Sequence, residues 1–183
     1  RMGAFFLAEF CQNATITGNL VDGTNGSRVI SVEKSCTDVT MTGNTFRNGG
    51  RGAWINQPVN FIMTGNVFVN NTTKNEPDMR RGRIAYQTAK PGQFPELYFT
   101  IYEPGASYGP VIVRDNHFIL GESAPDEAVT FAPNGHDLIF NGNTFQTKPV
   151  RIVVDPSCTT TQIENNLGAT TVSKPVDFNH GRR

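Results

Sequence analysis

The sequence predicts an all-β solenoid, a right-handed parallel β-helix of about five to six coils with one lateral insertion. Three observations support this: a short phrase that recurs along the chain, alternating apolar positions around each copy, and a composition rich in turn residues. The 183 residues include 18 glycines and 11 prolines, and 37% are hydrophobic. This length suits a single domain with a buried core. Residues 1–183 are therefore interpreted as one β-helix domain.

The recurring phrase is typified by Ile16-Thr17-Gly18-Asn19 and occurs in six related copies. The asparagines of the copies are Asn19, Asn44, Asn66, Asn116, Asn143 and Asn166. They are 25, 22, 50, 27 and 23 residues apart, so all but one interval fall near a single period. Repeats of this length indicate coils that stack on one another. The stacked side-chain amides are expected to form a hydrogen-bonded ladder.

Apolar positions at fixed offsets from the asparagine indicate which side chains face the core, because successive strand residues point to opposite faces. The third and fifth positions before it are apolar in almost every copy. Two positions after it stand Val21, Phe46, Phe68, Phe118 and Phe145. Twelve positions before it, a second inward column is predicted to hold Leu7, Val32, Trp54, Phe131 and Val154. Glycine directly precedes the asparagine in four copies, which suits a left-handed turn.

With this coil length, the phrase Ile-Thr-Gly-Asn-x-Phe resembles the right-handed parallel β-helix superfamily of pectate-lyase-like proteins, over roughly residues 5 to 168. The resemblance identifies no subfamily. It implies a secreted or periplasmic protein that acts on a polysaccharide along one face of the solenoid, as a lyase or a glycoside hydrolase. The alternative is a non-catalytic segment that binds glycan or forms a structural stalk or spike with partner chains.

The 50-residue interval between Asn66 and Asn116 departs from the period. Residues 97–103 are expected to supply a strand of the missing coil, which leaves residues 70–95 as a lateral insertion. Long excursions from a rigid scaffold often carry binding groups. The candidate substrate-binding residues of the insertion are Asp78, Arg80, Tyr86 and Lys90, and its candidate catalytic residues are Arg81 and Arg83. The alternative is a solvated loop whose arginines serve solubility alone.

Outward positions of the second strand provide another candidate site. Glu9 and Lys34 share one offset from the asparagine, and Glu33 shares its offset with Asp155, so these side chains should align along the stack. Glu9, Glu33 and Lys34 are candidate catalytic residues, and Glu103 and Asp155 are candidate substrate-binding residues. A lyase needs a base and a cation near the uronate carboxylate, whereas a hydrolase needs two carboxylates. A ladder of stabilising surface ion pairs is the alternative.

Composition argues against several classes of partner. The 16 basic and 16 acidic residues give a formal net charge of zero, so the chain lacks the basic field that attracts nucleic acid. No apolar stretch approaches the ~20 residues of a transmembrane helix. His117, His136 and His180 lack ligand spacing, so no metal site is predicted from them. Calcium stays open as a cofactor of a lyase.

The three cysteines fall at one offset from the asparagine, which places them at one structural position in different coils. They are Cys11, Cys36 and Cys158. A stack of buried, reduced thiols is the interpretation, and a disulfide between Cys11 and Cys36 in neighbouring coils is the alternative.

The sequence predicts how each end of the coil stack is covered. Phe5-Phe6-Leu7 already lies in a coil, and an uncovered first coil would expose strand edges and apolar core. We expect a partner chain or a second copy to cover that end, or the chain to be a fragment of a longer solenoid. Residues 170–183 lose the repeat and are expected to form a C-terminal tail or cap, with Phe178 over the core.

Overall fold

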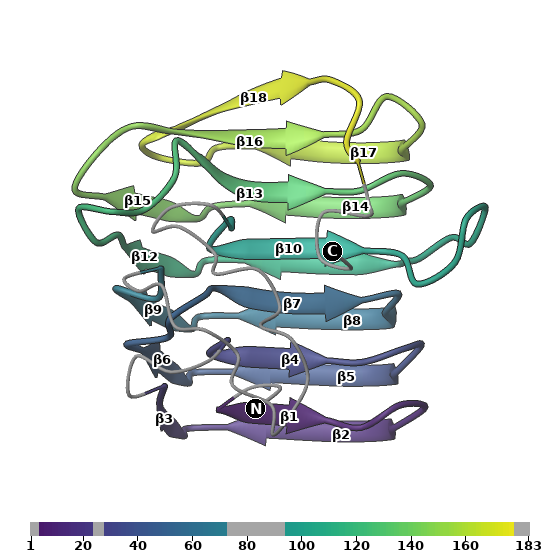
Figure 1. Cartoon of the computed structure of the whole chain (residues 1–183), viewed down its shortest axis with the longest axis horizontal. Coiled ribbons are helices and arrows are strands. Elements are labelled where there is room, and N and C mark those ends of the chain that lie inside the picture. The colour runs from purple at the N-terminus through teal and green to yellow at the C-terminus, as the bar shows by residue number, and fades with distance from the viewer. Residues whose placement is uncertain (1–3, 24–27, 73–93, 178–183) are drawn as a thin grey trace, which may run out of the picture.

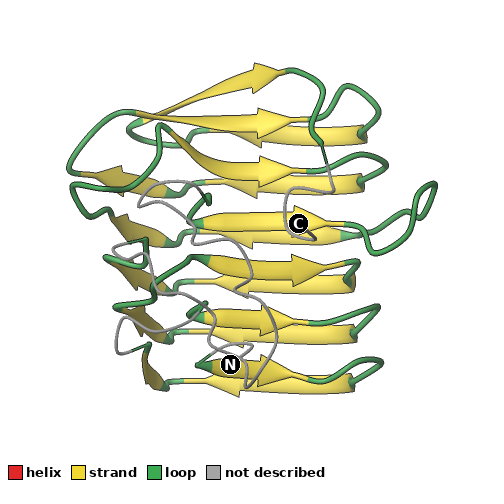
Figure 2. Cartoon of the chain, in the orientation of Figure 1, coloured by secondary structure: helices red, strands yellow, loops and turns green. Residues whose placement is uncertain are grey.

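A computed structural model describes residues 4–23, 28–72 and 94–177. These residues form eighteen strands and no helix (Figure 2). The described part of the chain accordingly contains no helix with the length and apolar character needed to cross a bilayer. The all-β class predicted from the sequence is confirmed.

The strands form three parallel sheets that wind into a right-handed β-helix, with successive coils stacked in chain order (Figure 1). The seven-stranded sheet contains β1 (Phe5–Leu7), β4 (Ile30–Val32), β7 (Ala53–Asn56), β10 (Leu97–Thr100), β13 (Glu127–Phe131), β16 (Val150–Val154) and β18 (Ala169–Ser173). The six-stranded sheet contains β2 (Gln12–Thr17), β5 (Thr37–Thr42), β8 (Val59–Thr64), β11 (Val111–Arg114), β14 (His136–Asn141) and β17 (Thr159–Glu164). The five-stranded sheet contains β3 (Leu20–Asp22), β6 (Thr45–Arg47), β9 (Val67–Val69), β12 (His117–Ile119) and β15 (Thr144–Gln146).

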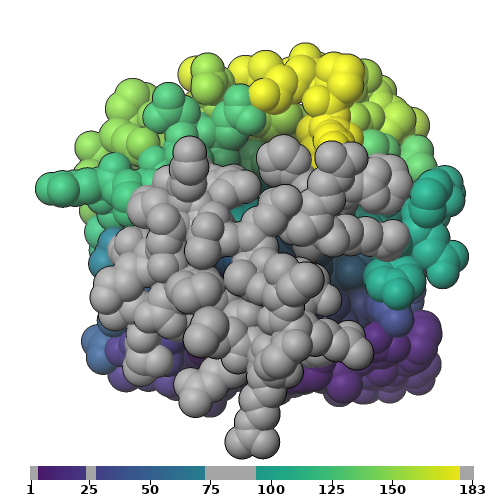
Figure 3. Space-filling view, viewed as in Figure 1, coloured from purple at the N-terminus to yellow at the C-terminus, as the bar shows by residue number. Residues whose placement is uncertain are grey.

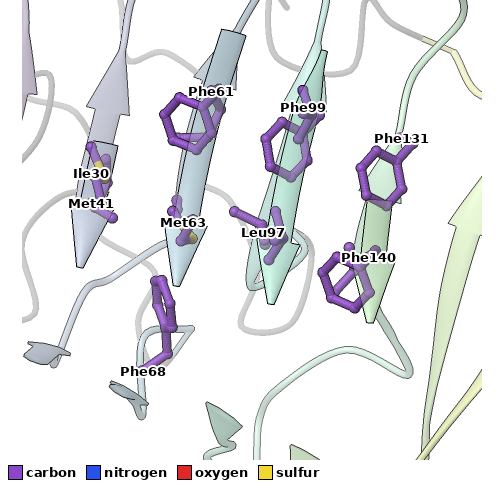
Figure 4. Close-up of a cluster of buried hydrophobic side chains, with 14 of the residues drawn as sticks. Ile30, Met41, Phe61, Met63, Phe68, Leu97, Phe99, Phe131 and Phe140 are labelled. Carbon is purple, nitrogen blue, oxygen red and sulfur yellow. The ribbon is translucent and has the colours of Figure 1, made fainter. Parts of the chain in front are cut away.

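Inward side chains of the three sheets fill the interior in columns, as the alternation of strand residues requires. Phe61 lies in register with Val39 of the coil before, and both are fully buried. The rings of Phe99 and Phe131 stack with their centroids 5.0 Å apart, and Phe131 meets Phe140 edge to face (Figure 4). The core is therefore continuous from coil to coil.

The phenylalanine column predicted two positions after the asparagine is confirmed. The ring centroids of Phe46 and Phe68 lie 5.2 Å apart, those of Phe68 and Phe118 4.8 Å, and those of Phe118 and Phe145 4.7 Å. These distances match the spacing of hydrogen-bonded strands, because the rings repeat once per coil. Offset stacking of this kind adds to the stabilisation from burial of the rings.

The predicted asparagine ladder is also confirmed. The Asn44 side-chain amide and backbone N–H both donate to Asn66 Oδ1 at 2.9 Å. The same two bonds join Asn66 to Asn116 at 2.9 Å, and Asn116 to Asn143 at 3.0 Å. The residue before each asparagine has positive φ, for example 63° at Gly43, so the turn directs the amide inward. The ladder satisfies polar groups that would otherwise be buried without partners.

The prediction that Trp54 lies in the inward column is wrong. Ile55 occupies that position, in register with Val32 and Phe99. The reason is the chain between the inward residue and the next strand: four residues separate Val32 from Thr37 at the start of β5, whereas three separate Ile55 from Val59 at the start of β8. The offset counted back from Asn66 is therefore shorter by one. Trp54 points outward and packs edge to face on Tyr98, with centroids 5.1 Å apart.

Two connections leave the regular coil. Strand β9 ends at Val69 and β10 begins at Leu97, which agrees with the predicted insertion at 70–95. Its candidate residues lie outside the described residues: Asp78, Arg80, Arg81, Arg83, Tyr86 and Lys90. Strand β10 ends at Thr100, so the predicted strand 97–103 is too long. Between the buried Ile101 and Tyr108, residues 102–107 form a second excursion, which projects beside the coils in teal (Figure 3).

The C-terminal segment first continues the helix and then crosses its outer surface. Strand β18 pairs with β16 although the sequence phrase has faded, because the edge of β16 still offers unpaired backbone groups. Residues 174–177 then cross the seven-stranded sheet, where Val176 packs against Trp54, Tyr98 and Ala132. Phe178 lies outside the described residues.

Candidate functional site

Lys34 and Glu9 align in neighbouring coils, as the sequence predicted, and form an ion pair. Lys34 Nζ lies 2.8 Å from a Glu9 carboxylate oxygen and 4.2 Å from the centroid of the Tyr102 ring. The hydrogen bond with Glu9 is the main influence that raises the pKa of Lys34. A base must be uncharged to accept a proton, so this environment disfavours Lys34 as the base of a lyase.

Glu33 is also engaged in surface contacts. Its carboxylate lies 3.7 Å from the Arg28 guanidinium and accepts a hydrogen bond from the Ser31 hydroxyl. The Arg28 guanidinium lies 4.3 Å above the centroid of the Trp54 ring. These contacts favour the surface-ladder interpretation of Glu9, Glu33 and Lys34.

Asp155 and Glu103 occupy different environments. Asp155 is buried, and its carboxylate accepts hydrogen bonds from the Ser157 amide and hydroxyl and from the Val176 amide. Burial alone would raise the pKa of Asp155, but these bonds together outweigh it and lower the pKa. Asp155 thus fixes the turn after β16 to the crossing segment 174–177. Glu103 is exposed in a turn after β10.

A cleft of about 670 Å³ lies on the outer face of the seven-stranded sheet. Its floor is Tyr98, Thr130 and Val153, which are successive partners across β10, β13 and β16. Its walls are Phe94 and Pro95, the loop 123–126 with Glu127 at the start of β13, Arg151 and the crossing segment 174–177. None of Glu9, Glu33 or Lys34 lines this cleft. We call it the outer-face cleft.

Charged side chains surround the outer-face cleft. Glu127 Oε1 lies 2.6 Å from Lys174 Nζ and 3.5 Å from Arg151 Nη2. Asp126 pairs with Lys148 at 3.1 Å, and the Lys148 ammonium also donates to the Ala124 carbonyl. One carboxylate, Glu127, therefore holds two cations at the rim.

The outer-face cleft was missed by the sequence analysis. Glu127 and Arg151 are partners across β13 and β16, yet they stand at different offsets from their asparagines. An irregularity in the register between Glu127 and Val129 is responsible. Such a bulge shifts a residue without changing the apolar pattern around it, so a fixed-offset alignment does not detect the pair.

The pKa of the Glu96 carboxyl group departs further from its ordinary value than that of Asp155. Its side chain is 1% exposed, and Glu96 Oε1 accepts a hydrogen bond from Asn71 Nδ2 at 2.8 Å. Glu96 Oε2 has no hydrogen-bond partner among the described residues. Burial raises the pKa of Glu96 to about 7, with the Asn71 bond acting in the opposite direction. Strongly perturbed acids are enriched at functional sites.

Glu96 makes a testable contribution to stability. Its pKa is 4.5 in an unperturbed state and about 7 in the fold, so between these values the folded chain holds a proton that the unfolded chain has lost. Stability should therefore fall as pH rises through this window and level off above it, by about 3 kcal/mol in total. Urea unfolding from pH 4 to 8 measures this, and Glu96→Gln should remove the loss. Glu103→Gln serves as an exposed control, and an unchanged pH profile in Glu96→Gln would contradict the assignment.

Comparison with known protein families identifies the family of this β-helix. A family model described as "Periplasmic copper-binding protein (NosD)" matches residues 3–94, half of the chain. The chain belongs to the NosD family. The periplasmic description of that family agrees with the expected secreted or periplasmic location. No curated protein and no solved structure matches the chain.

The copper binding in the NosD description has no matching donor set in the described residues. These contain no group of three or more His, Cys, Asp or Glu side chains that could hold a metal. The three cysteines form no disulfide, and the buried Cys36 Sγ lies 3.0 Å from both the Ala8 and the Glu33 carbonyl oxygens, which share its single proton as acceptors. Burial is the largest influence that raises the pKa of Cys36. The Cys36 thiol is engaged with backbone carbonyls and belongs to no group of three donors in the described residues, so these residues do not fit a copper site.

Proposed function

We propose that this NosD-family chain binds an acidic oligosaccharide in the outer-face cleft without cleaving it. The observation that carries the proposal is Glu127, which holds both Arg151 and Lys174 while its side chain remains 37% exposed. A carboxylate on a ligand can replace Glu127 on these two cations, because it offers the same charge-assisted hydrogen bonds. The resemblance to pectate-lyase-like β-helices supports the same class of ligand.

Ion pairing of the candidate catalytic groups favours binding over cleavage. Lys34 is paired with Glu9 outside the cleft, which leaves it charged. Within the cleft, Glu127 and Asp126 are each held by cations. Cleavage by a hydrolase needs two carboxyl groups that act directly on the scissile bond, whereas both carboxylates of this cleft are engaged by neighbouring cations.

Calorimetric titration with an oligomer of galacturonic acid tests the proposal. Lys174→Met removes one of the two cations and is expected to weaken binding about tenfold. Glu127→Gln removes the competing carboxylate and is expected to strengthen binding. Arg47→Met is the control, because Arg47 pairs with Asp22 outside the cleft, and it should leave the affinity unchanged.

A neutral oligosaccharide of equal length and mass spectrometry of the mixtures complete the test. Binding of the acidic but not the neutral oligomer, with no change in mass, is the expected result. Equal affinity for both, or no binding of either, would contradict the proposed ligand class. Products one water lighter than hydrolysis products would instead establish a lyase, and ordinary hydrolysis masses would establish a hydrolase.

A further inference from the structure

The corner where residues 70–72 meet residues 94–96 is built around a buried carboxyl group. Glu96 precedes β10, Asn71 follows β9, and the two side chains meet in the hydrogen bond of 2.8 Å. The Glu96 carbonyl also accepts the Ala53 amide at 2.8 Å. A β-carbon at Gly52 would lie 2.2 Å from that carbonyl oxygen, so the chain at Glu96 packs directly on the coil before.

Asn71 is fixed on its other side by an earlier coil. Asn71 Oδ1 accepts the Gly49 amide at 3.0 Å, and Asn71 Nδ2 also donates to the Phe46 carbonyl at 3.0 Å. The bond to Glu96 is thus linked through Asn71 to Phe46 in β6 and to Gly49 after that strand. Displacement of the Glu96 side chain away from Asn71 would break this side-chain link to β6.

The same corner supports two walls of the outer-face cleft. Phe94 and Pro95 directly precede Glu96 and line the cleft. On the other side, the Thr72 carbonyl accepts the hydroxyl of Ser123 at 3.2 Å, and Ser123 also lines the cleft. A change at the Asn71–Glu96 contact is therefore transmitted to both walls through one or two residues.

The carboxyl group in this corner has few polar neighbours. Glu96 Oε2 and Thr72 Oγ1 are both buried without a hydrogen-bond partner among the described residues. The raised pKa of Glu96 arises from burial, opposed by the hydrogen bond from Asn71, and no charged side chain among the described residues contributes to it. An ionised Glu96 would have one hydrogen-bond donor where a buried carboxylate needs several.

We propose that Glu96 is a proton-controlled clamp on the outer-face cleft, an inference that rests on the proposed function. Neutral Glu96 stays in the corner and holds Phe94, Pro95 and Ser123 in their positions. When Glu96 releases its proton to solvent, the carboxylate draws water into the corner and loosens both walls. Affinity for the acidic oligosaccharide therefore falls as pH rises through neutrality.

Two readouts test the clamp, and the first needs no ligand. Amide hydrogen exchange, corrected for the intrinsic pH dependence, should show loss of protection from pH 6 to 8 at Gly49 and Ala53. The amide of Val67, which donates to the Asn44 carbonyl, is the internal reference and should keep its protection. The Glu96→Gln variant should keep protection at all three amides, and Glu103→Gln should behave as the parent chain.

The second readout is titration with the galacturonic acid oligomer at pH 6 and pH 8. If only the neutral form is competent, affinity should fall about tenfold between these values. Glu96→Gln should bind equally at both. Unchanged protection of Gly49 and Ala53 in the parent chain would overturn the clamp, whether or not Glu96→Gln folds. Loss of protection without binding at either pH would support the clamp and refute the proposed function.

Discussion

Replacing Asn66 by alanine is expected to lower the free energy of unfolding by about 3–6 kcal/mol. Asn66 is fully buried, and its Oδ1 accepts both the backbone N–H and the side-chain amide of Asn44. Its own amide donates to the Met41 carbonyl at 2.9 Å and to Asn116 Oδ1. The variant leaves at least three buried groups without partners, each of which costs about 1–3 kcal/mol. Urea unfolding followed by far-ultraviolet circular dichroism measures the loss.

Asn19→Ala is the matched control for this prediction. Asn19 stands at the end of the ladder, is exposed, and donates to Asn44 Oδ1. When Asn19 is replaced, Asn44 remains bonded to Asn66 of the next coil. Its removal should lower stability by only about 1 kcal/mol. Equal losses in the two variants would mean that the internal rungs of the ladder are no more stabilising than its exposed end.

Truncation of Phe68 to alanine is expected to lower the free energy of unfolding by about 3–5 kcal/mol, as is typical for buried aromatic residues. Phe68 is fully buried between the rings of Phe46 and Phe118. The change removes both stacking contacts and leaves a cavity within a column that rigid coils cannot close. The same unfolding measurement applies.

Two further variants, Phe68→Leu and Val21→Ala, distinguish the effect of lost side-chain volume from the effect of how deeply the position is buried in the column. Leucine fills most of the space and should cost less than about 1.5 kcal/mol. Val21 occupies the same column in the first coil but is half-buried, so its truncation should have a smaller effect than that of Phe68. A neutral Phe68→Ala would show that the register of the column is misassigned.

The repeat made the fold predictable because equivalent residues make the same contacts in each coil. The asparagine, the residue before it and the phenylalanine after it each meet their equivalents in the next coil, so a fixed offset in sequence becomes a contact. Trp54 shows where this reasoning fails. A connection one residue shorter than in the preceding coil puts Ile55 rather than Trp54 in the inward column, and no apolar pattern distinguishes these two side chains.

The candidate site was less predictable because it lies where the repeat is broken. The Glu9–Lys34 alignment followed the period and forms the ion pair that was the alternative to a catalytic role. Glu127 and Arg151 meet across a bulge, and Glu96 stands beside the insertion, where no equivalent residue exists for alignment. The burial that perturbs Glu96 depends on contacts with Gly52 and Asn71 from other coils.

The uniform bonding of the ladder has a consequence for how such a chain can change during evolution. Asn44 and Asn66 are 22 residues apart and Asn66 and Asn116 are 50 residues apart, yet both pairs are joined by the same two bonds. The contact between coils is therefore independent of the length of chain that separates them. Segments can be gained or lost between strands without redesign of the interior, and new binding surfaces can arise at such junctions while the stack itself is inherited intact.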